Sequence, residues 1–219
     1  MNSKNEILNR LRLGKISDRK EKVKQWTDKD IFADFPGESD KLIDIFSKQL
    51  KKLSGDLYVA NSIEQATRIL KSLLEKVEPE QCKSHNSRLI DKLKKVSPGI
   101  AEYLTYIDEL EISSEEYAKF DVGITGADCL IARTGSILLQ AKSAGGRRLS
   151  VLPPTHIVIA EENQIVASLD SALKMLDLDR NEWSYATIIS GPSRTSDIEK
   201  QIVLGAHGPK KLIVILLKN

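Results

Sequence analysis

The residues that decide the fold lie between Asp121 and Pro209. This part of the chain contains DVGITGADCLIARTGSILLQ (residues 121–140), GGRRLSVLPPTHIVIA (145–160) and YATIISGPSRTSDIEKQIVLGAHGP (185–209). Apolar runs rich in β-branched residues alternate there with short loops of glycine, proline and polar residues, a pattern typical of buried parallel strands. Two runs, 121–125 and 185–190, end directly in glycine-containing polar loops. If both strands are parallel, these loops open on the same edge of the sheet, where open α/β sheets bind their ligands.

Outside this segment, the spacing of apolar residues predicts further helices and strands. Residues 1–38 are expected to form a helical extension, and residues 39–219 an α/β domain. Ser39 is a candidate N-cap for the first helix of that domain, and Gly55 is its expected stop. The predicted helices are residues 39–53, 62–77, 113–120 and 168–176. The predicted strands are residues 56–60, 121–125, 136–140, 148–152, 156–160, 185–190 and 212–217.

Some stretches give a less definite pattern. Residues 127–132 fit a short buried helix or a turn, and Gly145-Gly146 is a turn signal that could join the strands on either side as a hairpin. His85 lies among polar neighbours, which favours a solvated loop over a ligand site. His156 begins a predicted strand, where we expect a structural histidine with its hydrogen bonds satisfied. Two stretches remain without an assigned element, residues 78–98 and 101–110.

The composition is that of an ordinary globular protein and excludes several classes. Hydrophobic residues make up 41%, charged residues 29%, and the net charge is +2. Basic and acidic side chains are balanced in both parts of the chain, 22 against 21 in residues 1–120 and 11 against 10 in residues 121–219. The charge therefore indicates neither nucleic acid nor a membrane surface as a partner. No apolar run is long enough for a membrane span and the polar start is not a signal peptide, so we expect a cytoplasmic protein.

The two cysteines limit the redox chemistry of this chain. Cys82 and Cys129 are far apart in sequence, and two thiolates cannot hold a four-cysteine iron–sulfur cluster. We therefore expect reduced thiols, with no metal and no cofactor bound by this chain. The GxSxG, GxxxxGK[ST], GxGxxG and HExxH motifs are missing from the sequence. Serine-hydrolase, P-loop, dinucleotide-binding and zinc-protease functions therefore have no support.

The loop after residues 185–190 is the first candidate site. It offers two hydroxyls and a guanidinium, from Ser193, Thr195 and Arg194. A helix should begin after them at Ser196, which forms a capping box with Glu199. Backbone donors, hydroxyls and an arginine suit a phosphate or a carboxylate. In the alternative, polar side chains of the first helical turn, including Asp197, cap the helix themselves and leave no place for an anion.

Two titratable side chains near this loop are candidate catalytic groups. His207 lies in the segment GAHGP, and a histidine on a rigid loop can titrate near neutral pH and act as an acid or a base. Asp197 is a candidate for moving a proton if the chain is an enzyme by itself. The alternatives are a surface histidine without a role and a helix-capping aspartate.

The loop after residues 121–125 is the second candidate site. It contains Thr125, Gly126 and Asp128, of which Asp128 could orient a substrate hydroxyl, hold a catalytic arginine or histidine, or cap a following helix. Thr134 and Ser136 add two hydroxyls on either side of a glycine, where the backbone could approach a ligand closely.

These loops are predicted to converge on one pocket. The carboxyl ends of parallel strands meet at one edge of a sheet, so the loops at Thr125, Thr134, Ser193 and His207 should lie together. Arg147, in a basic glycine-containing loop, is expected at the rim of the pocket.

The chain resembles the LUD domain of the lactate utilisation protein C family. The resemblance rests on four blocks in order and spacing, TGADCLIARTGS, LSVLPPTHIVIA, ISGPSRTSDIE and GAHGP. It is close from residue 121 to the C-terminus, weaker in KNEILNRLR at the start, and limited to a helix–strand pattern between them. It implies an α/β fold with a mainly parallel sheet flanked by helices. That fold is similar to the ribose-5-phosphate isomerase, glucosamine-phosphate deaminase and CoA-transferase group.

The resemblance also implies a function. Members of this family are needed for the oxidation of L-lactate to pyruvate in bacteria, together with two iron–sulfur partner proteins that would carry the clusters. The alternatives are a self-sufficient enzyme acting on a sugar phosphate or CoA ester, and a non-catalytic scaffold. Residue types do not choose between these ligands, because carboxylate and phosphate accept hydrogen bonds from the same donors. The chain departs from the family at Arg133, where members commonly carry an acidic residue. If that carboxylate is a nucleophile or base, this chain lacks it.

Overall fold

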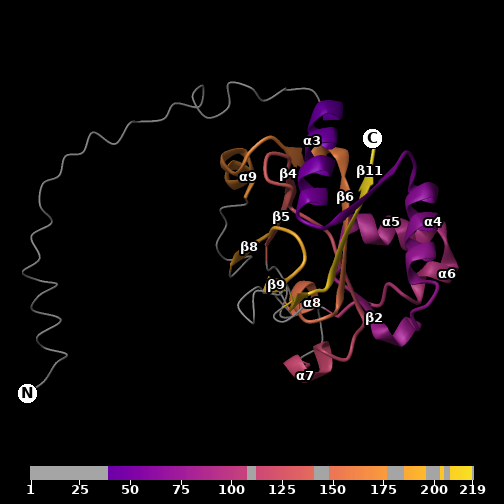
Figure 1. Cartoon of the computed structure of the whole chain (residues 1–219). Coiled ribbons are helices and arrows are strands. Elements are labelled where there is room, and N and C mark those ends of the chain that lie inside the picture. Colours follow the sequence, from indigo (N-terminus) through magenta and orange to yellow (C-terminus); the bar gives the residue numbers. More distant parts are fainter. Residues whose placement is uncertain are drawn as a thin grey trace, which may run out of the picture. The chain divides into compact units, whose positions relative to one another are not determined.

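The computed structural model describes residues 39–107, 112–140, 148–176, 185–195, 203–204 and 208–218. The chain divides into two compact units, residues 1–35 and 36–219. The first unit, with the helix predicted in it, lies outside the described residues. The second unit holds all the elements labelled in Figure 1. Among the described helices, none has the length and apolar character needed to cross a membrane.

A five-stranded parallel sheet forms the centre of the second unit, which confirms the predicted fold class. Its strands lie in the order β1–β11–β6–β3–β2, and every neighbouring pair is parallel. Strand β11 is buried along almost its whole length, as its continuous apolar sequence predicts. The bounds are β1 Asp56–Ala60, β2 Cys82–Ser84, β3 Val122–Thr125, β6 Thr155–Glu161 and β11 Lys211–Leu217.

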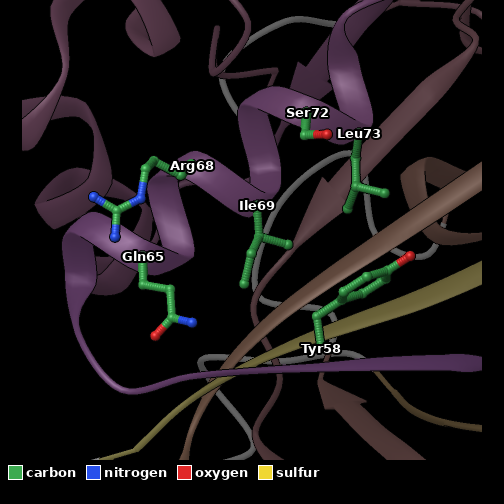
Figure 2. A pocket seen from close by; sticks show the side chains of 6 residues that line it. All are labelled: Tyr58, Gln65, Arg68, Ile69, Ser72 and Leu73. Atoms are coloured by element: carbon green, nitrogen blue, oxygen red, sulfur yellow. The ribbon is translucent and has the colours of Figure 1, made fainter.

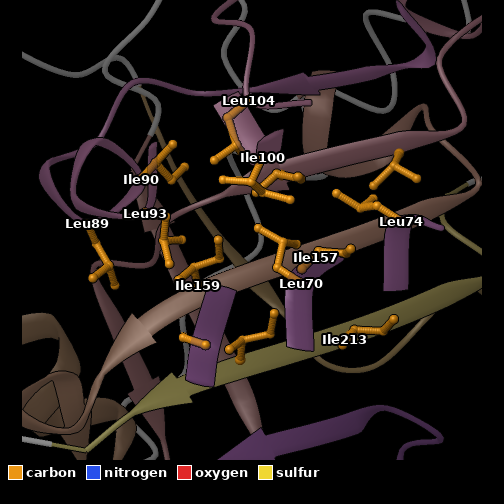
Figure 3. Close-up of a cluster of buried hydrophobic side chains, with 14 of the residues drawn as sticks. Leu70, Leu74, Leu89, Ile90, Leu93, Ile100, Leu104, Ile157, Ile159 and Ile213 are labelled. Carbon is orange, nitrogen blue, oxygen red and sulfur yellow. The ribbon is translucent and has the colours of Figure 1, made fainter. Parts of the chain in front are cut away.

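Three helices cover one face of this sheet, namely α4 (Ile63–Leu74), α5 (Arg88–Val96) and α6 (Pro98–Ala101). Ser62 and Ser87 cap α4 and α5 by accepting hydrogen bonds from backbone N–H groups in the first turn. Leucines and isoleucines of these helices pack against Ile157, Ile159 and Ile213 of the central strands (Figure 3). Burying each of these side chains contributes roughly 1.5–3 kcal/mol relative to leaving it in water, so this cluster is the main stabilising core.

The opposite face of the sheet contacts α3 (Ser39–Lys52) and α8 (Arg148–Val151), and a second sheet lies on the same side (Figure 1), where its strand β7 (Ile165–Val166) contacts α3. Side chains alternate along a strand, so His156, Val158 and Ala160 of β6 point away from the isoleucine face and toward this layer. A Cβ atom added at Gly123, the neighbour of His156 in β3, would lie 2.1 Å from the Leu149 carbonyl oxygen of α8. The backbone of α8 therefore lies directly against β3. Figure 1 shows the central strands between these two layers.

The second sheet has four strands in the order β7–β4–β5–β8, with β5 antiparallel to both of its neighbours. Two predictions are corrected here. Residues 129–131 form strand β4 and not a buried helix or turn, because they pair with β5 in a tight hairpin. Residues 185–190 contain an antiparallel strand of this sheet and not a buried parallel strand of the main one. The bounds are β4 Cys129–Ile131, β5 Ser136–Gln140, β7 Ile165–Val166 and β8 Ala186–Ile189.

Two more predictions differ from the structure. Residues 148–152 do not form a strand paired with β5, because residues 148–151 are helix α8. Helix α3 ends at Lys52, close to its expected stop at Gly55, but Ser54 and not the glycine takes the left-handed conformation, with φ 66°. The Gly55 N–H then donates to the Leu50 carbonyl at 3.0 Å, which closes the helix end. The unassigned residues 78–98 contain β2 and α5. The remaining elements are α7 (Ser114–Tyr117), α9 (Leu169–Met175), β9 (Arg194–Thr195), β10 (Val203–Leu204) and the 3₁₀ turns Pro79–Gln81 and Glu162–Gln164.

Candidate functional site

The carboxyl end of β3 carries a buried group of hydrogen-bonded polar side chains. The Thr125 side chain is fully buried, and its hydroxyl donates to the Gly126 carbonyl at 2.8 Å. The same hydroxyl oxygen lies 2.9 Å from Nε2 of His156, which is also fully buried. Thr125 and His156 come from neighbouring strands and share the face opposite the isoleucine core. Buried polar groups of this kind fix the local backbone, because losing a partner leaves an unsatisfied group.

His156 is held neutral by its surroundings. Burial, and secondarily the nearby charge of His85, lowers the pKa of His156 from 6.5 to about 3. A neutral imidazole at neutral pH can donate one hydrogen bond and accept one, and it carries no charge for a ligand. His156 is therefore suited to holding Thr125 in place and unsuited to acting as a cationic anchor.

The end of β2 lies beside the end of β3. The His85 N–H donates to the Ile124 carbonyl at 3.0 Å, which extends the pairing of the two strands by one residue. Ser87 then begins α5, with its hydroxyl accepting from the Ile90 N–H at 3.2 Å. A Cβ atom at Gly126 would lie 3.6 Å from the Ser87 Cβ, so the two loops are in contact. A glycine here leaves the backbone open beside the positive end of a nine-residue helix.

The rest of the Gly126 loop is tied to the second sheet. The Gln164 side-chain amide donates to the Ala127 carbonyl, and the Asp128 carboxylate accepts from the Gln140 backbone N–H at 2.6 Å. Asp128 therefore joins the start of β4 to the end of β5. Asp128 was predicted to orient a substrate hydroxyl, hold a catalytic side chain or cap a helix. Its bond to the Gln140 N–H is a cap on the backbone, but of a strand pair and not of a helix.

Thr134 and Ser136 lie at the other end of the β4–β5 hairpin. Thr134 is exposed, whereas the Ser136 hydroxyl is hydrogen-bonded to the Ser190 hydroxyl at 2.8 Å. Gly135 has φ 65°, and a Cβ atom on it would lie 2.4 Å from the Leu50 backbone nitrogen. The close approach at this glycine is therefore to helix α3 and not, as predicted, to a ligand.

The Ser193 loop lies at the opposite edge of the main sheet from Thr125. The Ser193 N–H donates to the Pro209 carbonyl at 2.8 Å, just before β11 begins at Lys211. Thr125, in contrast, ends β3. The prediction that these two loops share a pocket is wrong, because β8 is an antiparallel strand of the second sheet. The Ser193 loop instead meets the Ser136 turn through Ser190.

The remaining predicted site residues are only partly described. Arg194 is exposed in β9, and Thr195 is described only in its backbone, which pairs with Val203. Three residues lie outside the described part of the chain, namely Arg147, Asp197 and His207. The polar group at β3 therefore has two members that we predicted as ligand-binding residues, Thr125 and Gly126.

Comparison with known proteins gives the family. Residues 43–217 match the model of the LUD domain. This chain belongs to the LUD domain family. The match confirms the resemblance seen in the sequence and covers most of the residues that form the two sheets.

Several relatives of this LUD domain are called lactate utilization protein C. The one from Halalkalibacterium halodurans is 27% identical over 187 residues, which cover 83% of this chain and 81% of that protein. The one from Deinococcus radiodurans is 38% identical over 111 residues, which cover 50% and 52%. A solved structure of a DUF162 family protein from Deinococcus radiodurans has a TM-score of 0.60 and 24% identity, covering 83% of this chain and 99% of that one. This last similarity supports the fold alone.

Arg133 of this LUD domain lies in the β4–β5 turn, beyond the far end of β4 from Asp128. Its side chain is exposed, and its N–H donates to the Ala167 carbonyl at 3.1 Å. Arg133 stands where the family resemblance implies a carboxylate. This position is separated from Thr125 by the length of strand β4. A base at this position would not act on a ligand held at Gly126.

The thiols of the LUD domain are unsuited to reaction or metal binding. Burial raises the pKa of Cys82 to about 12 and that of Cys129 to about 11, so both stay protonated at neutral pH. Within the described ranges, no three histidine, cysteine or acidic side chains gather in a way that could hold a metal ion.

Two surface grooves of the LUD domain lie away from the β3 site. One, of about 400 Å³, runs between β1 and α4 and is lined by Tyr58, Ile69 and Leu73 with three polar residues (Figure 2). The other lies on α3 beside Lys48 and Lys52. Both are open to solvent and neither includes a buried polar side chain. We place the candidate site at β3, because fixed polar groups rather than open volume determine how a small ligand is oriented.

Sequence reasoning missed the contribution of His85. His85 was expected in a solvated loop, yet it extends the β2–β3 pairing and lowers the pKa of His156. His156 is a structural histidine as expected, with Nε2 hydrogen-bonded to Thr125, but its Nδ1 is not satisfied among the described residues. A histidine inside an otherwise apolar strand signals that a polar partner must lie nearby, but the sequence does not show that this partner is Thr125, 31 residues away.

Proposed function

We propose that this LUD domain protein is a cytoplasmic component of L-lactate utilisation that acts with separate iron–sulfur proteins. The observation that carries this proposal is its similarity to the lactate utilization protein C of Halalkalibacterium halodurans, which extends over 83% of the chain. The iron–sulfur partners would hold the redox centres, with this chain contributing binding and positioning.

We further propose that a small anion binds at the carboxyl ends of β2 and β3. The loops of both strands meet there, at the edge where α/β sheets generally hold their ligands. The start of α5 adds a positive helix end, and Gly126 lets a ligand approach the backbone. L-Lactate and pyruvate are small carboxylates, and one or two backbone N–H donors are enough to orient either of them.

A ligand titration of the purified protein tests this proposal. L-Lactate, pyruvate, a sugar phosphate and a CoA ester are added separately, and the melting temperature and NMR spectrum are recorded. A ligand that binds only the native state raises the melting temperature with occupancy. We expect a weak response to L-lactate with the isolated protein and a larger one when the partner proteins are present.

Matched threonine variants locate the binding site. Thr125→Val removes the buried hydroxyl with little change in volume, whereas Thr134→Val changes an exposed threonine of the β4–β5 turn. We expect only Thr125→Val to weaken the response to L-lactate. Turnover of a sugar phosphate or CoA ester by the isolated chain, lost in His207→Ala or Asp197→Asn, would instead identify a self-sufficient enzyme.

A further inference from the structure

His156, Thr125 and Gly126 form a short chain of hydrogen bonds below the candidate site. The His156 Nε2 and the Thr125 hydroxyl oxygen are 2.9 Å apart, and that hydroxyl lies 2.8 Å from the Gly126 carbonyl oxygen. A threonine hydroxyl has a single proton to donate. A carbonyl oxygen can only accept, so the bond to Gly126 uses that proton. The Thr125 oxygen must then accept from His156, whose Nε2 must carry the proton.

The surroundings of the other imidazole nitrogen favour the same tautomer. His156 Nδ1 is buried and has no hydrogen-bond partner among the residues that the structure describes. With the proton on Nε2, the unsatisfied group is an acceptor. With the proton on Nδ1, it would be a buried N–H donor, which is rarer in proteins. The Nδ1–H tautomer would also draw the Thr125 proton to Nε2 and leave the Gly126 carbonyl without its donor.

This hydrogen-bond chain fixes one peptide group of the loop. The carbonyl and N–H of a trans peptide point in opposite directions, so a Gly126 carbonyl held by Thr125 turns the Ala127 N–H away from Thr125. Gly126 and Ala127 are both partly exposed, so the peptide between them belongs to a partly exposed part of the loop. Glycine has no side chain to restrict its backbone dihedral angles, so the hydrogen bond from Thr125 is needed to fix the orientation of the Gly126 carbonyl. Gln164 holds the next carbonyl, that of Ala127.

We propose that His156 is a positioning residue for this site: its Nε2 proton commits the Thr125 hydroxyl to the Gly126 carbonyl and so presents the Ala127 N–H to a small anion. The part that concerns the anion rests on the proposed function. The part that concerns the loop stands independently, because it follows from the hydrogen bonds within the chain.

The tautomer is tested directly by NMR. The chain has three histidines, so long-range ¹H–¹⁵N spectra of uniformly labelled protein give three sets of signals, and His156→Gln identifies one of them. We expect His156 to show a protonated Nε2 and an unprotonated Nδ1 at pH 7. The opposite pattern, or a doubly protonated ring at this pH, would overturn the proposal.

Three variants test the positioning role. His156→Gln keeps an N–H that can reach Thr125, His156→Leu removes it, and Thr125→Val removes the hydroxyl. The backbone amide signals of Gly126 and Ala127 are then compared with those of the wild-type protein. We expect the leucine and valine variants to shift these signals, because the Gly126 carbonyl loses the hydrogen bond that fixes the orientation of its peptide group. The glutamine variant should remain close to wild type.

The anion part is tested by titrating L-lactate into the same samples. We expect the affinity to fall roughly tenfold in Thr125→Val and to be largely retained in His156→Gln. If the wild-type protein shows no response to L-lactate, the proposed function fails while the tautomer and the amide signals still decide the positioning role. If His156→Leu does not fold, Thr125→Val carries the test. Unchanged Gly126 and Ala127 signals in a folded Thr125→Val variant would overturn the proposal.

Discussion

Acidification should destabilise the native protein through His156. The side chain is fully buried, and burial with the nearby charge of His85 lowers its pKa from 6.5 to about 3. Below pH 6.5 this histidine is protonated in the unfolded chain. In the folded protein it stays neutral until the pH falls to about 3. The stabilising contribution is therefore complete above pH 6.5 and is lost as the pH falls toward 3. At 1.36 kcal/mol per pH unit, the loss by pH 5 is about 2 kcal/mol.

Urea denaturation followed by circular dichroism measures this loss. The free energy of unfolding is determined between pH 7.5 and pH 5 for the wild-type protein and for His156→Gln, which cannot titrate but can still donate to Thr125. The two other histidines, His85 and His207, are present in both proteins and cancel in the comparison. The wild-type protein should lose about 2 kcal/mol more than the variant over this range.

The reasoning fails if the two proteins lose stability in parallel as the pH falls. Parallel curves would mean that His156 takes up its proton as easily in the folded protein as in the unfolded chain. A difference that grows toward alkaline pH would contradict the sign of the pKa shift.

Three further predictions concern groups away from His156. Gly135→Ala should destabilise the protein by about 2 kcal/mol or more in the same urea assay, because φ is 65° and the new Cβ would lie 2.4 Å from a backbone nitrogen of α3. Thr134→Ala, at the exposed neighbouring residue, should change the free energy of unfolding by less than about 0.5 kcal/mol. Cys82 and Cys129 should resist alkylation at pH 8 in the native protein and react only after unfolding, since their pKa values are about 12 and 11; rapid labelling of the folded protein would refute this. Asp128→Asn should cost roughly 1.5–3 kcal/mol in stability without removing the response to L-lactate, and the reverse result would show that this carboxylate contacts the ligand.

Most of the parallel sheet could be predicted because its central strands β3, β6 and β11 are buried, largely apolar runs. Strand β1 has the predicted bounds, and the predicted strands at 121–125, 156–160 and 212–217 match β3, β6 and β11 to within one residue at either end; in the second sheet, β5 also has its predicted bounds. Runs of this kind must be buried on both faces, and a parallel sheet between two layers satisfies that requirement.

Other elements could not be read from a local pattern. Residues 185–190 are as apolar and β-branched as a central strand, yet β8 is partly exposed and pairs antiparallel with β5. Nothing within one strand states which sheet it joins or in which direction. Residues 148–152 are a short apolar run that fits a strand or a helix equally, and only the packing of α8 against Gly123 decides between them. Strand β2 and helix α5 could not be predicted, because their apolar faces are narrow and lie among many charged side chains.

The candidate site was predicted only at its β3 end. Thr125 and Gly126 follow a recognisable strand, so their place at the end of β3 could be read from the sequence. The link between Thr125 and His156 depends on β6 lying next to β3. The link to His85 depends on β2 lying on the other side of β3. Both neighbours are distant in sequence, so no local pattern reveals them. The roles proposed for Arg147, Asp197 and His207 remain predictions.

Growth on L-lactate tests the proposed function most directly. A strain that lacks this gene, and has no second copy of it, is grown with L-lactate or with pyruvate as the only carbon source. We expect loss of growth on L-lactate with normal growth on pyruvate, restored by the wild-type gene and by the Thr134→Val variant but reduced with Thr125→Val. Undiminished growth of the deletion strain on L-lactate would contradict the assignment of this LUD domain protein to L-lactate utilisation.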